Sequence, residues 1–97
     1  MIEHMVLFKL KEDAPAGAGD RMIERLRALR QTVPGVIDLT CGANFSPRSQ
    51  GFTHGLLVRF ESRADLDAYA VHPEHQRAVA EAVKPAVESI LALDYEY

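Results

Sequence analysis

The chain has 97 residues, and its 47% hydrophobic and 26% charged content is typical of a folded globular domain, which excludes a disordered or fibrous class. Eleven basic residues against fourteen acidic ones give a net charge of −3, so the basic excess of a nucleic-acid-binding protein is missing. No apolar run approaches the roughly 20 residues of a membrane helix, and no signal-peptide pattern opens the sequence. The lone cysteine, Cys41, cannot form an intrachain disulfide, so we expect a cytoplasmic protein.

The first half of the chain shows a strand, a helix and a second strand. Residues 2–10 alternate in the direction of their side chains, which predicts a strand. Apolar residues then recur at three- and four-residue spacing over 22–33, which indicates an amphipathic helix that ends at Pro34 and Gly35. A second strand is expected over residues 36–45.

The second half adds a hairpin partner, two helices and a last strand. A polar turn over residues 46–51 leads into a strand at 52–60. Ser62 and Asp65 have capping-box spacing and open a short helix that cannot easily pass His72-Pro73. Pro73 suits the start of the next helix, which is expected to be bent or interrupted at Pro85 and to run through Val79, Val83 and Val87. Residues 90–97 complete the chain as a fourth strand.

This order predicts one α+β domain over residues 1–97, with a four-stranded, mainly antiparallel sheet and its helices on one face. The two sheet faces are both partly apolar. Val6 and Phe8 point to one side of the first strand, whereas Met5 and Leu7 point to the other, as Leu57 does in the third strand. Because three modest helices cover one face only, we expect a homodimer in which a second copy covers the other.

Four histidines are candidates for a site. His4 shares a strand face with core residues, and so does His54, so the two rings either line a pocket or are buried and satisfied within the core. The segment YAVHPEH brings Tyr69, His72 and His75 within two turns. At the start of a helix His75 is favoured in its neutral form and can act as a base, with Tyr69 polarising a carbonyl. The alternative is capping by His72 and packing by His75.

Other site chemistry has weaker support. His72 and His75 have the spacing for a shared metal ion, but no third ligand completes a set, so no metal is expected. Cys41 lies on a strand with no neighbouring base and is interpreted as a core residue. No glycine-rich fingerprint or phosphate-binding loop is present, and we expect no cofactor.

Six fragments in this order resemble the stress-responsive dimeric A/B barrel (Dabb) family over almost the whole chain: HMVLFKLK, VPGV, CGANFS, GFTHGLLVRFES, LDAYAVHPEHQ and LALDY. The resemblance implies a ferredoxin-like monomer and a dimeric α/β barrel. The family includes plant stress proteins without an established reaction and a plant polyketide cyclase. The cyclase pattern implies His75 and Tyr69 as catalytic residues, with His4 and His54 lining the pocket. From its place in YAVHPEH, we also expect His72 among the substrate-binding residues. Where that enzyme has bulky aromatic residues, this chain has small ones such as Ala78, Ala82 and Val83, which implies a ligand of another shape.

Three functions remain open at this point. The first is a non-catalytic stress-response or small-ligand-binding dimer. The second is a cyclase or isomerase in which His75 removes a proton next to a carbonyl and Tyr69 stabilises the enolate oxygen, the ligand being a small carbonyl compound. The third is a cofactor-free or haem-linked monooxygenase. An open cavity lined by the candidate histidines and Tyr69 favours chemistry, and a closed, filled core favours binding or structure alone.

Overall fold

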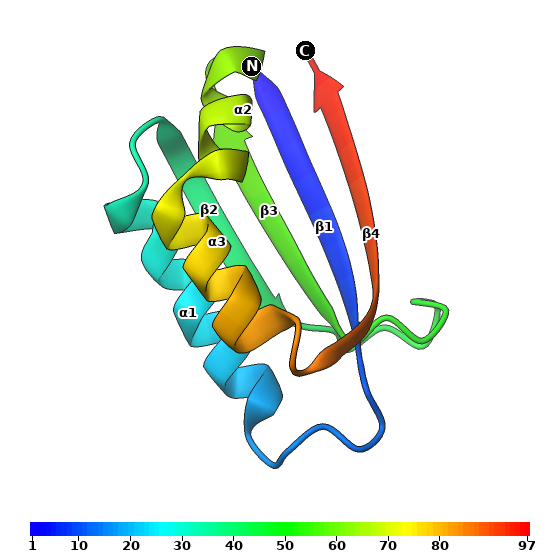
Figure 1. The fold of residues 1–97 in the computed structure, drawn as a ribbon. Coiled ribbons are helices and arrows are strands. Elements are labelled where there is room, and N and C mark those ends of the chain that lie inside the picture. The colour runs from blue at the N-terminus through cyan, green and yellow to red at the C-terminus, as the bar shows by residue number, and fades with distance from the viewer.

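The computed structural model describes all residues 1–97 and contains one antiparallel sheet with a helical layer on one face (Figure 1). The strand order in the sheet is β2-β3-β1-β4, and each neighbouring pair is antiparallel. The four strands are β1 (Ile2–Leu10), β2 (Val36–Ala43), β3 (His54–Phe60) and β4 (Val87–Glu96). This is the ferredoxin-like α+β arrangement, and it confirms the expected fold class.

The helical layer comprises α1 (Ala18–Thr32), α2 (Arg63–Val71), α3 (Pro73–Ala78) and a π-helical turn, η1 (Val79–Val83). The Ser62 side chain caps α2 by accepting a hydrogen bond from the Asp65 N–H at 3.2 Å, as the capping-box spacing predicts. No helix in the structure is long and apolar enough to cross a membrane.

The core lies between the helices and the sheet face that the side-chain alternation predicts. The buried strand residues include Val6, Phe8, Leu56, Val58 and Phe60. From the helices they meet Met22, Leu26, Leu29, Tyr69 and Val83. The helical spacing of the α1 residues and the two-residue period of the strands therefore point their apolar side chains into one shared layer.

The last helix is shorter than the sequence predicts. It ends with η1, where the Lys84 N–H donates to the Val79 carbonyl at 2.8 Å, and Val87 belongs to β4 instead of the helix. Pro85 has no N–H to continue the helical ladder. The Ala86 carbonyl already accepts from the Lys11 N–H at 2.8 Å, so the chain enters the sheet directly after the proline.

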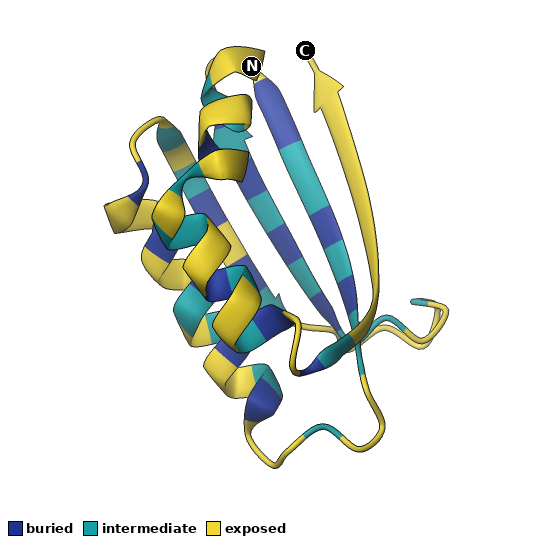
Figure 2. Cartoon of the chain, viewed as in Figure 1, coloured by how far each residue is buried: buried dark blue, intermediate teal, exposed yellow.

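The opposite sheet face has no helical cover. Met5, Leu7 and Leu57 lie on it half-buried, as predicted, and Leu91 and Leu93 of β4 are more than half exposed. Figure 2 shows β4 exposed along nearly its whole length, whereas β1 and β3 alternate between buried and intermediate residues. We call this surface the open face.

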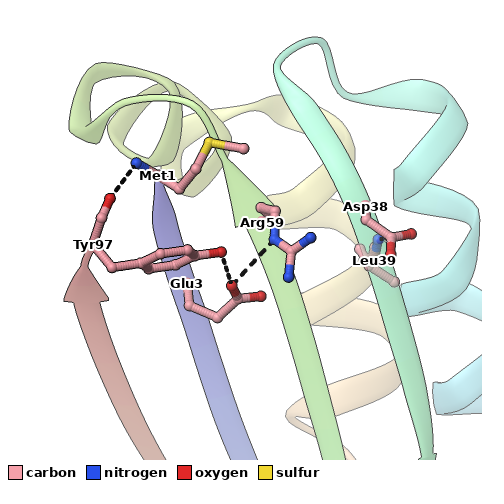
Figure 3. Close-up of polar contacts among 6 residues, drawn as sticks. All are labelled: Met1, Glu3, Asp38, Leu39, Arg59 and Tyr97. Atoms are coloured by element: carbon pink, nitrogen blue, oxygen red, sulfur yellow. Dashed lines mark hydrogen bonds and ion pairs between the residues drawn. The ribbon is translucent and has the colours of Figure 1, made fainter.

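One end of the open face carries a buried carboxylate. Glu3 is only 4% exposed although no helix covers it. The Tyr97 hydroxyl donates to its Oε2 at 2.8 Å and the Arg59 Nε–H donates to the same atom at 3.2 Å (Figure 3). These charge-assisted hydrogen bonds offset the desolvation of the carboxylate. The open face is therefore polar and internally paired at this end.

Candidate functional site

The break between α2 and α3 sets the positions of the histidines in YAVHPEH. Pro73 occupies the first position of α3, and His72 is the N-cap residue before it. The His72 Nδ1 accepts a hydrogen bond from the Glu74 N–H at 3.1 Å, so this ring caps the helix. The change of direction brings His75, in the first turn of α3, against Tyr69 of α2.

Three side chains from separate elements form the Tyr69 cluster, which we define as His4, Tyr69 and His75. Tyr69 lies in the middle and is 1% exposed. Its ring centroid lies 4.4 Å from that of His75 and 6.0 Å from that of His4, and Phe60 packs against it at 5.2 Å. Residues far apart in the sequence thus meet on the helix-facing side of the sheet.

His75 has a neutral ring with a defined tautomer. Burial lowers its pKa below the ordinary value, the nearby His4 and His72 act in the same direction, and a hydrogen bond to the Ala70 carbonyl opposes them. Because a carbonyl only accepts, the contact of 3.1 Å places the proton on Nδ1 and leaves the Nε2 lone pair free. The direction agrees with the sequence expectation, but burial is the main cause and not the helix terminus.

Tyr69 is a donor without an acceptor. Its hydroxyl is buried and has no hydrogen-bond partner in the chain. Burial raises the pKa of this phenol well above its usual range, and the neighbouring Cys41 acts in the same direction. Burial also raises the pKa of the Cys41 thiol, which keeps it protonated. Tyr69 therefore holds a proton that it can offer to an acceptor brought in from outside the chain.

Asp94 is a member of this region that the sequence analysis missed. It lies on β4 directly opposite His4, and its Oδ1 is hydrogen-bonded to the His4 Nδ1. The Asp94 side chain is 46% exposed and that of His4 only 14%, so the pair connects the Tyr69 cluster to the surface. The alternation of residues 90–97 fixes the face of Asp94, but only the strand register reveals its partner.

His54 lies apart from the Tyr69 cluster. It shares the helix-facing side with His4, but it pairs with Phe8, four residues further along β1, which corresponds to about 13 Å. Its ring lies under α1 beside Gly19, and its Nδ1 is 2.8 Å from the Thr53 hydroxyl. The structure therefore does not bring His54 together with His75, because alternation sets the face on which a residue lies and not its distance along the strand.

The main surface pockets do not lie at the Tyr69 cluster either. None of the five main pockets is lined by His4, Tyr69 or His75, whose rings pack against one another. No group of three or more His, Cys, Asp or Glu side chains is arranged to hold a metal ion. The cluster is thus a filled, close-packed site, with one unpaired donor and one free lone pair.

Comparison with known proteins places the chain in a family. The model of the Stress responsive A/B Barrel Domain matches residues 2–97. The chain belongs to this family. One Stress-response A/B barrel domain-containing protein from Arabidopsis thaliana is 40% identical over 98% of this chain, and a second from the same plant is 36% identical over 98%. The chain spans only 36% and 46% of those two relatives.

Two named enzymes are more distant relatives. Olivetolic acid cyclase from Cannabis sativa is 23% identical over 97% of this chain and 94% of its own length. A hydroxynitrile lyase from Passiflora edulis has a TM-score of 0.85 at 26% identity, over 97% of this chain and 90% of that one. Proteins similar to this chain therefore include stress-response proteins and enzymes of more than one kind.

Solved structures with this fold include proteins described as dimeric. One of unknown function from Jannaschia sp. has a TM-score of 0.79 at 35% identity, over 99% of this chain and 98% of that one. Another, from Bacteroides fragilis, has a TM-score of 0.86 at 29% identity, over 99% and 95%.

Proposed function

We propose that this chain is a homodimeric stress-response domain that binds a small carbonyl compound at the Tyr69 cluster and needs no catalysis for that role. The observation that carries the proposal is the buried Tyr69 hydroxyl without a partner, beside a neutral imidazole. An unsatisfied buried donor costs about 1–3 kcal/mol, so a ligand oxygen that accepts from it gains an interaction the free protein lacks.

The apolar surroundings of the Tyr69 cluster support a small ligand. Ala78 of α3 and Val83 of η1 are buried in the same core, and the Phe60 ring packs against Tyr69, so the surroundings are apolar apart from the cluster itself. A ligand carbonyl would accept from the Tyr69 hydroxyl, while the His75 Nε2 would accept from a donor on the same molecule. Entry would pass the exposed Asp94 at the uncovered strand β4.

The open face supports the homodimer. It carries half-buried Met5, Leu7 and Leu57 beside exposed Leu91 and Leu93, a contiguous apolar surface that a monomer would leave in water. The dimeric proteins with this fold favour the same assembly. The free cysteine Cys41 supports a reducing compartment, and we propose that the dimer is cytoplasmic.

Nuclear magnetic resonance titration with a carbonyl probe tests the binding proposal. Acetophenone and cyclohexanone added to the labelled protein are expected to shift the side-chain resonances of His4, Tyr69 and His75 while those of His54 stay unchanged. Tyr69→Phe, which removes only the hydroxyl, should weaken binding about tenfold, as expected for a lost hydrogen bond. Shifts confined to the His54 end, or equal binding by Tyr69→Phe, contradict the proposal.

Acid-base chemistry at the same cluster is the second candidate, and the free Nε2 lone pair of His75 beside Tyr69 favours it. In this reaction the His75 Nε2 takes a proton from the carbon next to the carbonyl while the Tyr69 hydroxyl donates a hydrogen bond to the enolate oxygen. The protonated His75 ring exchanges that proton with solvent and returns one to the carbon, which restores both the ketone and the neutral ring. The relationship to olivetolic acid cyclase supports it.

Deuterium exchange separates the two candidates. An enzyme should speed exchange of the acetophenone methyl protons in deuterated water, and His75→Ala should lower that rate by about 10² to 10⁴. His72→Asn is the matched control, because asparagine preserves the helix cap. If acetophenone binds but its deuterium exchange is not accelerated, the acid-base candidate is contradicted and the non-catalytic role is supported.

A further inference from the structure

Two glycines are paired across neighbouring strands on the open face, and nothing within a single chain requires glycine at either position. Gly42 of β2 pairs directly with Gly55 of β3. Neither has a positive φ, so ordinary residues could adopt their backbone conformation. A Cβ on Gly42 would meet nothing within 4 Å, and one on Gly55 would meet only the Leu7 Cδ2, at 3.8 Å.

Glycine within a strand is less stable than alanine and often marks a place where another group approaches closely. Neither backbone conformation nor packing within the chain explains this pair. The space that side chains would occupy there is therefore available to a group from outside the chain. The hollow above the pair measures about 380 Å³, and Leu7 and Phe52 form apolar parts of its lining. We call it the glycine notch.

A fully exposed aromatic ring stands at the rim of the same hollow. Phe45 is 100% exposed, on the loop that projects beyond the sheet between β2 and β3 (Figure 1). The loop is braced by the Asn44 side chain, which donates to the Ser46 carbonyl at 2.9 Å and the Ser49 hydroxyl at 3.0 Å and accepts from the Ser46 N–H at 3.0 Å. A braced loop that holds a large ring in water is typical of an interface anchor.

We infer that Phe45 of a second copy enters the glycine notch, and that each copy of the homodimer receives the other's ring. A two-fold dimer buries the same patch on both copies, so a patch with a projecting ring beside a hollow can pair with itself. The notch is continuous with the rest of the apolar open face, because a second hollow shares Leu7, Gly42 and Gly55 with it and extends to Met5 and Leu57.

The charge distribution favours this end of the face. At the far end, Arg59 and Tyr97 both donate to Glu3, and none of the five main pockets is lined by these residues. Around the notch, the lining is apolar or uncharged apart from the His54 edge. The inference rests on the proposed homodimer. It adds that the Phe45 side chain determines how the two copies are oriented relative to each other.

A double-mutant cycle on the dimer dissociation constant, measured by sedimentation, tests the inference. Phe45→Ala should raise the constant about tenfold or more, as for a buried aromatic anchor. Gly55→Val fills the notch from within and should raise it similarly. The double variant should be little worse than either single one, because both changes remove the same contact. Val71→Ala, which trims a 67% exposed side chain on α2, is the matched control and should leave the constant unchanged.

The results of this experiment distinguish a failure of the Phe45 contact from a failure of the proposed homodimer. A monomeric wild-type protein at micromolar concentration overturns the homodimer itself. A wild-type dimer whose constant is insensitive to Phe45→Ala, or additive losses in the double variant, overturns the inference alone. Should Gly55→Val fail to fold, isotope-filtered spectra of mixed labelled wild-type dimers decide it. Contacts between the Phe45 ring of one copy and the Gly55 α-protons of the other support the inference, and their absence contradicts it.

Discussion

Two histidines in the layer between the sheet and the helices have different surroundings. His54 has its Nδ1 directed at the Thr53 hydroxyl and its other edge pressed under Gly19 of α1. His75 also uses Nδ1 inside the chain, but its ring faces Tyr69, whose hydroxyl has no partner. The first ring is enclosed and hydrogen-bonded by its surroundings, whereas the second stands beside unused hydrogen-bonding capacity. Burial of a histidine alone therefore does not indicate a site.

The hydrogen bonds of Thr53 explain why His54 is structural. The Thr53 hydroxyl donates to the Phe8 carbonyl at 3.2 Å and accepts from the Leu10 N–H at 3.1 Å. Since its single proton is committed to the carbonyl, it can only accept from the His54 Nδ1–H. His54 thus joins β3 to the end of β1 and to the start of α1.

Replacing each histidine by alanine should separate the two roles most strongly. We expect His54→Ala to lower the free energy of unfolding by about 2–4 kcal/mol, because it opens a cavity and removes a hydrogen bond. His75→Ala should lower it by about 1 kcal/mol, since that ring is only half-buried. Urea denaturation measures both, and equal losses would remove the distinction.

Gly19 tests how tightly the His54 end is packed. A Cβ at this position would lie 2.9 Å from the His54 Nε2 and 3.2 Å from the Leu10 Cδ1. Alanine normally favours a helix over glycine by about 1 kcal/mol, but the overlap here should reverse the sign and cost about 1–2 kcal/mol. Thermal unfolding checks it, and restored stability of Gly19→Ala in a His54→Ala background would identify the ring as the obstacle. A stabilised single variant would show that the ring moves freely.

Acidification should weaken the fold through both rings. Burial lowers the pKa of His54, with Asp20 opposing, and it also lowers that of His75. The unfolded chain then binds more protons than the folded one below the ordinary histidine value of about 6.5. The contribution is complete above that pH and is lost as the pH falls toward the folded values. Unfolding free energies at pH 7.5 and 5.5 should show a smaller decrease for His54→Ala and for His75→Ala than for the wild type.

The sequence predicted the strands and the partition of their side chains, because a two-residue period is a local property of residues such as Val6 and Met5. It could not predict which residues meet across strands. The His4 and Asp94 pair and the separation of His54 from His75 both depend on register, which the assembled sheet sets. The early end of the last helix at Val83 depends on the sheet capturing Ala86, a tertiary contact that helical spacing does not contain.

The smallest change in stability should come from Tyr69→Phe. This variant is the sharpest test of the difference between the hydrogen-bonded His54 and the unpaired hydroxyl beside His75. The ring of Tyr69 fills the core between Phe60 and His75, and a phenylalanine ring at this position keeps that packing. The hydroxyl has no partner, so its removal forfeits no hydrogen bond and relieves the burial of an unsatisfied donor. We therefore expect a change within about 0.5 kcal/mol of wild type, or a slight gain, in urea denaturation. A loss of about 1–2 kcal/mol would mean that the hydroxyl is satisfied within the folded protein, as His54 is, and would remove the reason for placing a ligand at this cluster.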